Sequence, residues 1–150
     1  IIPFGTGKSL LGQLQLLARE RPHAVLHAAA LGDFKVHQIQ DGQNRPLDHK
    51  KIPSAVPEIK VVLRPAPKVI RLLRGLFPDS KLVGWKYELE GGKNDALQKG
   101  RRQIHTNKTD ACVLNGKAYG DGYGFCAADG GVTHLDDAAR LAAHFAAWLK

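Results

Sequence analysis

The sequence predicts an α/β domain with a mostly parallel sheet. Short apolar runs at residues 24–30, 81–87 and 110–115 have the length and composition of buried strands. Between them lie segments with apolar residues at helical spacing, at 69–76 and 93–106. Strands that alternate with helices pair in parallel through right-handed crossovers, so this order of elements favours an α/β architecture.

The first third of the chain is expected to form a helix, a strand and a long loop. Ser9 is a candidate N-cap, because leucines at helical spacing follow it until the chain reaches Pro22. Residues 24–30 then form an apolar strand that Gly32 interrupts. Residues 31–55 are polar and rich in turn formers, and a loop of this length in a small domain is usually functional or mobile.

The middle of the chain alternates between the two kinds of element. Residues 58–64 begin with polar and apolar side chains in alternation and predict a strand. Pro67 suits the first turn of a helix that continues through residue 76. After the strand at 81–87, residues 92–106 are expected to form a basic helix.

The last third closes the domain. Glycines concentrate in residues 116–131, which we expect to be a loop. Residues 132–134 predict a short strand, and Asp136 or Asp137 is expected to cap a closing helix that runs through residue 147.

Length and composition restrict the class of protein. With 150 residues and 43% hydrophobic side chains, the chain can build one domain with one core. The chain contains no methionine, so we expect an N-terminally incomplete protein. No signal peptide is present and two cysteines make no disulfide framework, which favours the cytoplasm. No apolar run reaches membrane length, so we expect no membrane association. A net charge of +8 favours nucleotides, phosphorylated metabolites or nucleic acid as partners, or simply a solvated surface.

The strongest candidate site lies around Asp33. Ala28, Ala29 and Ala30 end a strand and leave space for a ligand at the edge where ligands bind in open α/β sheets. The Asp33 carboxylate could accept hydrogen bonds from sugar hydroxyls or a base amine, or it could cap a turn. Lys50 and Lys51, in the loop that follows, could place an ammonium on a phosphate or remain solvated charge.

Other patterns carry weaker indications. Residues 5–9, Gly-Thr-Gly-Lys-Ser, resemble a phosphate loop but lack its first glycine, which favours a strand-to-helix turn capped by Ser9. The basic residues of 99–108 could bind phosphate or nucleic acid, although no aromatic residues are interleaved for base stacking. The histidines do not fall at metal-ligand spacing, so we expect no metal site.

Several segments taken together resemble the phosphopantothenoylcysteine synthetase (phosphopantothenate–cysteine ligase) family of coenzyme A biosynthesis. The matching segments keep the family's order along the chain. They are residues 28–34 (Ala-Ala-Ala-Leu-Gly-Asp-Phe), Lys51-Ile52, residues 82–88 (Leu-Val-Gly-Trp-Lys-Tyr-Glu), residues 110–115 (Asp-Ala-Cys-Val-Leu-Asn), Gly124-Phe125 and Val132-Thr133.

The resemblance implies a three-layer Rossmann-like domain whose N-terminal part is missing here, and a homodimer, as is usual in the family. It implies a ligase that uses CTP, or ATP in some lineages, as a magnesium complex to convert the carboxylate of 4′-phosphopantothenate into an acyl nucleotide. The amine of cysteine then displaces the nucleoside monophosphate. The resemblance further allows an upstream flavoprotein decarboxylase domain, with no flavin on this chain.

The resemblance also assigns roles to residues. Lys51 would support the acyl-nucleotide chemistry. The nucleotide would lie against Ala28, Ala29, Ala30, Asp33, Trp85, Asn115 and Phe125, and the phosphates against Lys50, Arg101, Arg102 and Lys108.

Three departures from the family pattern leave alternatives open. The family's N-terminal glycine-rich phosphate loop and its asparagine-bearing segment would precede this chain. The loop before Lys51 is longer than usual, and Pro53 and Ser54 follow Ile52 in place of a second lysine. Gln103 and Asn107 stand where lysines are expected. The alternatives are a divergent nucleotide-binding relative with another or no ligase activity, and a basic nucleic-acid-associated module.

Overall fold

The computed structural model describes residues 1–48 and 51–150, which form two compact units. The first unit combines residues 1–30 with 69–150, and the second comprises residues 31–68. Each unit is described by itself.

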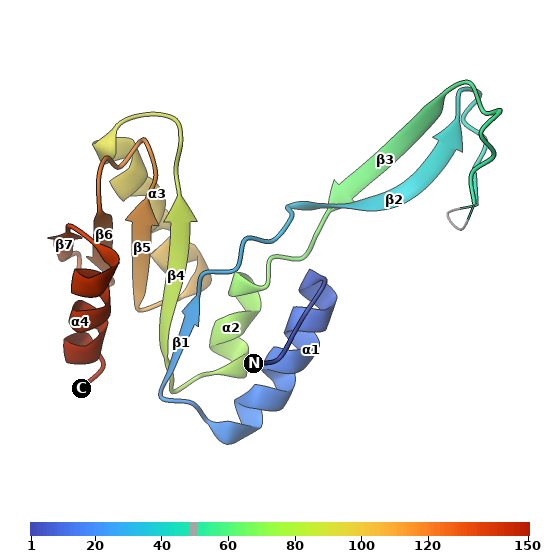
Figure 1. The fold of residues 1–150 in the computed structure, drawn as a ribbon. Helices are drawn as coiled ribbons and strands as arrows, with labels where there is room; N and C mark the ends of the chain where they lie inside the picture. The colour runs from blue at the N-terminus through green and yellow to red at the C-terminus, as the bar shows by residue number, and fades with distance from the viewer. Residues whose placement is uncertain (49–50) are drawn as a thin grey trace. The chain divides into compact units, whose positions relative to one another are not determined.

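The first unit contains a five-stranded sheet in the order β1-β4-β5-β6-β7 (Figure 1). Strands β1 (Ala24–His27), β4 (Lys81–Tyr87) and β5 (Ala111–Asn115) are parallel neighbours. Strands β6 (Tyr123–Ala127) and β7 (Val132–Leu135) extend the sheet in antiparallel pairing. The predicted α/β class is therefore confirmed, but β6 lies inside the segment 116–131 that was expected to be a loop.

Helices cover both faces of this sheet and make the expected three layers (Figure 1). Helices α2 (Ile70–Leu76) and α3 (Lys93–Asn107) pack on one face, and α4 (Ala138–Trp148) packs on the other. On the α4 side the core joins Val113 and Phe125 of the sheet to Phe145 of the helix. On the α3 side it joins Cys112 and Leu114 to Ile104.

The N-terminal helix α1 (Gly7–Leu17) begins two residues before Ser9, so the prediction that Ser9 is the N-cap is wrong. Thr6 is its N-cap, and the backbone N–H groups of Gly5 and Thr6 donate to Ser9 Oγ. Ser9 N in turn donates to Thr6 Oγ1, so Ser9 is the N3 residue of a capping box at the start of the helix. A short 3-10 turn, η1 (Ala18–Glu20), follows it. At the other end of the chain, Asp137 caps α4 as predicted, by accepting from Arg140 N.

The second unit is a two-stranded antiparallel ribbon of β2 (Phe34–Asp41) and β3 (Ile59–Pro65). The prediction of a strand at 58–64 is confirmed, whereas the prediction of a loop throughout 31–55 is wrong for the residues of β2. Within the described residues no helix has the length and apolar character needed to cross a membrane.

Candidate functional site

The carboxyl ends of β1, β4 and β5 meet at one edge of the sheet. Their register places His27 beside Gly84 and Tyr87 beside Asn115, so the residues that end these strands line a common edge. In open α/β sheets the crevice outside this edge is where ligands bind. Ala28 and Ala30, which follow β1, are exposed, and Ala29 is half-buried.

Charged side chains occupy this edge on the α3 side of the sheet. Glu88 follows β4 and is nearly buried, and its two carboxylate oxygens face different lysines. Lys99 Nζ of α3 lies 2.5 Å from Oε2, and Lys86 Nζ of β4 lies 3.3 Å from Oε1. Burial opposes ionisation of Glu88, but the hydrogen bonds and charges of the two lysines outweigh it and lower the pKa of the carboxyl.

Aromatic and amide side chains occupy the same edge on the α4 side. Trp85 is half-buried, with its ring centroid 6.2 Å from that of Phe145. Tyr87 is 65% exposed, and its register partner is Asn115. The side-chain oxygen Oδ1 of Asn115 is buried and has no hydrogen-bond partner among the described residues. The edge therefore offers flat apolar surface beside an acceptor that lacks a donor.

His27 ends β1 at this edge. The residue is half-buried, and burial lowers the pKa of its imidazole, so the side chain is neutral at pH 7. A neutral imidazole keeps one donor and one acceptor nitrogen.

Two of the predicted site residues in the first unit, Phe125 and Lys108, lie away from this edge. Phe125 belongs to β6. Its ring is 2% exposed and packs against the rings of Phe145 and Trp148, so no face of it is open to a ligand. Lys108 follows the last residue of α3, and its carbonyl accepts from Arg74 at the amino end of β5. Because α3 spans about 22 Å at ~1.5 Å per residue, Lys108 is at the opposite edge.

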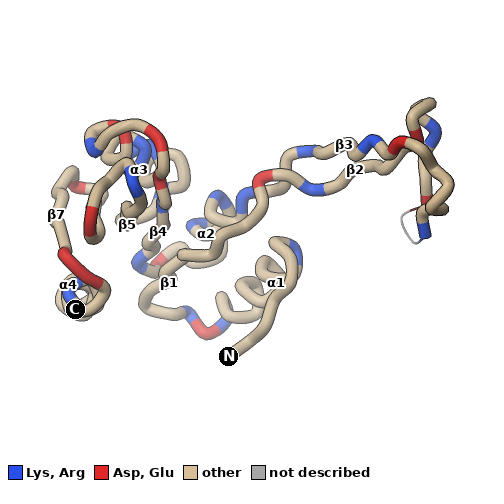
Figure 2. The backbone as a smooth tube through the Cα atoms, turned by 45° about the horizontal axis from the view of Figure 1, so that its top comes forward, with Lys and Arg blue, Asp and Glu red and all other residues tan. Residues whose placement is uncertain are grey.

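The remaining predicted cations lie in different places. Arg101 and Arg102 are exposed on α3, where Figure 2 marks a run of basic residues. Lys50 lies outside the described residues. Lys51 is exposed, in the connection between β2 and β3.

Within the second unit the structure does not bring Asp33 and Lys51 together. Asp33 directly precedes β2, is 66% exposed on its side chain and pairs with Lys68 Nζ at 3.3 Å. The described part of the connection that carries Lys51 lies beyond the other end of the ribbon (Figure 1). The ribbon is about 25 Å long at ~3.3 Å per residue, so the two groups do not share one pocket within this unit.

The sequence prediction missed the set formed by Lys86, Glu88 and Lys99. A signal for the first two was present, because residues two apart on a strand share a face, and Lys86 and Glu88 flank the strand end. Lys99 was recognised only as one of several basic residues in a helix. Its position over Glu88 depends on how α3 packs, which the sequence pattern does not give.

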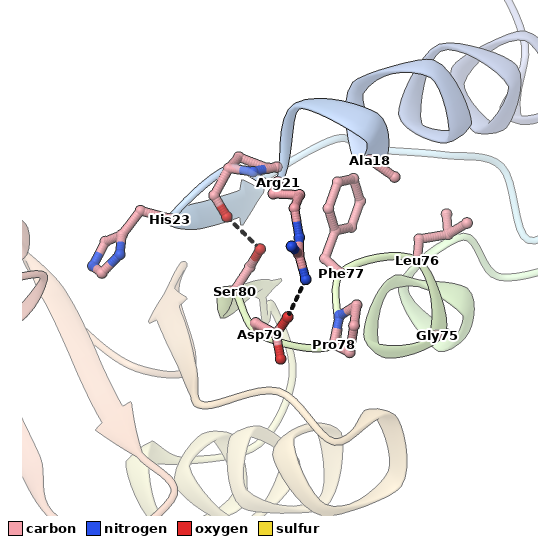
Figure 3. Close-up of a pocket in the computed structure, with 10 residues that line it drawn as sticks. Ala18, Arg21, His23, Gly75, Leu76, Phe77, Pro78, Asp79 and Ser80 are labelled. Atoms are coloured by element: carbon pink, nitrogen blue, oxygen red, sulfur yellow. Dashed lines mark hydrogen bonds and ion pairs between the residues drawn. The ribbon is translucent and has the colours of Figure 1, made fainter.

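A cavity of about 670 Å³ lies at the other edge of the sheet, near the amino ends of β1 and β4 (Figure 3). It contains none of the predicted site residues. Its polar side chains are partnered: Ser80 Oγ donates to the carbonyl of Pro22, and Arg21 pairs with Asp79 at 3.5 Å. Unlike the carboxyl edge, where Asn115 Oδ1 has no hydrogen-bond partner among the described residues, the cavity therefore offers a ligand no such group.

No protein-family model matches the sequence, and no curated protein matches it significantly. Solved structures share its fold. A DNA/pantothenate metabolism flavoprotein from Streptococcus pneumoniae superposes with a TM-score of 0.77 at 18% identity, over 97% of this chain and 71% of that one. The C-terminal domain of the coenzyme A biosynthesis bifunctional protein CoaBC gives a TM-score of 0.67 at 12% identity, over 98% and 62%.

A third similar structure is a Cab2 mutant in complex with phosphopantothenate-cysteine. It gives a TM-score of 0.64 at 18% identity and covers 99% of this chain and 53% of that one. The chain thus spans between 53% and 71% of the length of these proteins. The fold that the sequence resemblance implied is confirmed over nearly all of this chain.

Proposed function

We propose that this chain belongs to a nucleotide-dependent ligase that joins 4′-phosphopantothenate to cysteine. The observation that carries the proposal is the fold that nearly the whole chain shares with a coenzyme A biosynthesis bifunctional protein and with a Cab2 mutant in complex with phosphopantothenate-cysteine. Two of the motifs that first suggested the family, residues 82–88 and 110–115, contain strands β4 and β5, whose carboxyl ends contribute to the candidate site. A third, residues 28–34, begins directly after β1.

The proposed reaction has two steps. The substrate carboxylate attacks the α-phosphorus of CTP or ATP, which forms an acyl nucleotide and releases pyrophosphate. The cysteine amine then attacks the acyl carbon, loses a proton and displaces the nucleoside monophosphate. Magnesium bound to the triphosphate would offset its charge in the first step.

We assign the nucleoside to the carboxyl edge. Ala28 and Ala30 are exposed and carry no side chain beyond Cβ, so a flat ring can approach the backbone closely. Trp85 and Asn115 provide apolar contact and a hydrogen-bond acceptor at the same edge. Asp33 and Lys51 belong to the second unit and lie at opposite ends of its ribbon, so they are not both assigned to this nucleoside. Lys51 keeps a separate proposed role, which is to stabilise negative charge in the acyl-transfer chemistry.

We further propose that the protein acts as a homodimer in the cytoplasm. Apolar side chains of the ribbon, including Phe34, Val36, Val61 and Leu63, are each at least half exposed. A two-stranded ribbon is marginally stable alone, so a second copy that covers this apolar surface would stabilise it. The cysteines are free thiols, which suits a reducing compartment.

The test is an assay of pyrophosphate release by the protein that contains this chain. We expect release to require both 4′-phosphopantothenate and CTP or ATP, and Lys51→Gln to slow turnover at least tenfold. Lys35→Gln changes another lysine of the ribbon and should retain wild-type turnover. Release that does not depend on 4′-phosphopantothenate would refute the substrate assignment, and nucleotide-independent binding to DNA with steep salt dependence would favour the nucleic-acid module.

A further inference from the structure

The cluster of Lys86, Glu88 and Lys99 lies where two glycines allow α3 to pack closely on the sheet. A Cβ on Gly100 would lie 3.1 Å from Leu114 atoms, and one on Gly84 would lie 3.1 Å from the Gln103 side chain. The two glycines therefore let the helix lie close to β4 and β5. This packing brings the side chain of Lys99 over the end of β4.

Glu88 is held firmly at this position. Its backbone N–H donates to Asn115 O, and its carbonyl accepts from Ala118 N, which ties the end of β4 to the loop after β5. Its side chain is 13% exposed, so the carboxylate has little access to water and takes its hydrogen bonds from the lysines.

The two lysines exceed the charge of the carboxylate by one. Their side chains are 38% and 35% exposed for Lys86 and Lys99, so both ammonium groups reach solvent. Each ammonium has three donors and gives one to Glu88, which leaves donors directed elsewhere. Gln103, one turn further along α3, does not compete, because its amide donates to the carbonyl of Trp85.

We propose that Lys86 and Lys99 bind a phosphate group at the carboxyl edge of the sheet and that Glu88 is the residue that positions them. Two ammonium groups fixed by one buried carboxylate form a preorganised site for a phosphoryl or pyrophosphoryl group. The identity of the ligand as the phosphates of a nucleotide rests on the proposed function. The anion site itself can be tested without it.

The experiment is calorimetric titration of the chain with inorganic pyrophosphate. We expect Lys86→Gln and Lys99→Gln each to weaken binding about tenfold, as the loss of one charge-assisted hydrogen bond would. Lys99→Arg keeps the charge and should bind within about threefold of wild type. Lys117→Gln removes an exposed lysine outside the cluster and should have no effect.

Glu88→Gln separates positioning from simple neutralisation. The substitution preserves size and removes one negative charge. If Glu88 did no more than reduce the positive charge of the two lysines, the variant would bind pyrophosphate more tightly than wild type. A positioning residue gives affinity equal to or weaker than wild type. Thermal unfolding by circular dichroism checks each variant, and if Lys99→Gln fails to fold, Lys86→Gln carries the test.

Wild-type affinity in the folded lysine variants would overturn the proposal, as would failure of the wild type to bind pyrophosphate. Pyrophosphate binding that depends on the lysines, without binding of CTP or ATP, would support the anion site and refute the nucleotide assignment. If CTP or ATP binds with wild-type affinity to both lysine variants, the nucleotide assignment is supported and the anion site at Lys86 and Lys99 is refuted.

Discussion

Replacing Arg74 by methionine should destabilise the first unit through the loss of several hydrogen bonds at once. The guanidinium donates to the carbonyls of Lys108, Pro78 and Ser80 at 2.9, 2.9 and 3.0 Å, and to Asp110 Oδ2 at 2.7 Å. It thereby joins the ends of α2 and α3 to the starts of β4 and β5. Methionine retains most of the packing of the side chain and removes every donor.

The magnitude follows from the exposure of the groups. The side chain of Arg74 is 25% exposed, whereas that of Asp110 is 37% exposed, so solvent screens the ion pair and we assign it only ~1 kcal/mol. The hydrogen bonds to the three carbonyls add about 2 kcal/mol, because water can replace part of them. We expect a total loss of about 3 kcal/mol, which for a chain of this length lowers Tm by roughly 6–12 °C.

Urea unfolding followed by circular dichroism measures this loss. Arg74→Lys keeps the charge but cannot reach all four acceptors from one ammonium, so it should recover about half of the stability. Arg71→Met changes an exposed arginine on the same helix and should cost less than about 0.5 kcal/mol. If Arg74→Met and Arg71→Met unfold at the same urea concentration, the role assigned to Arg74 is refuted.

Three further predictions concern packing, pH and thiol reactivity. Gly124→Ala would place a Cβ 2.5–2.8 Å from ring and hydroxyl atoms of Tyr119, which is 3% exposed. Because a buried ring can shift only by disturbing its neighbours, we expect a loss of about 2 kcal/mol in urea unfolding, and unchanged stability would contradict this. Burial lowers the pKa of His27 below its unfolded value of about 6.5, so the folded state binds fewer protons and the free energy of unfolding should fall as pH drops from 7.5 to 5.5. His27→Gln should reduce this dependence on pH. An identical dependence in both proteins would refute the role assigned to His27. Burial raises the pKa of the Cys112 and Cys126 thiols, so iodoacetamide at pH 8 should modify them only as the protein unfolds, whereas rapid modification of folded protein would show that they are accessible.

The elements that the sequence predicted well are those whose side-chain pattern is set by burial. β4 matches its predicted range because its central residues are apolar and buried, as the 0% exposure of Leu82 and Val83 shows. α3 and α4 match within two residues, because their apolar stripes face the sheet and Asp137 supplies a cap.

The two missed strands lack that signal for different physical reasons. β2 contains polar residues such as His37 and Gln38 and is half-exposed or exposed for most of its length, so a polar loop was the simpler interpretation. β6 contains Gly124, which is needed where the Tyr119 ring occupies the space of a side chain. Glycine indicates a turn in a sequence, whereas here it allows a close contact inside a sheet.

The candidate site was predictable where it depends on strand ends and not where it depends on three-dimensional packing. Ala28, Trp85 and Asn115 lie at the carboxyl edge as their positions after or within strands imply. Lys108 was grouped with Arg101 because the two are close in sequence, although the length of α3 carries Lys108 to the opposite edge.

The central claim, that a nucleotide binds at the carboxyl edge of the sheet, can be tested with the two tryptophans of the chain. Trp85 lies near the carboxyl end of β4, while Trp148 lies near its amino end, with Lys81 Nζ 4.8 Å from its ring. In ¹H–¹⁵N spectra recorded during titration with CTP or ATP, we predict a saturable shift of the Trp85 indole N–H and none of the Trp148 indole. If both nucleotides leave Trp85 unshifted, or shift the two indoles alike, the nucleotide does not bind at this edge.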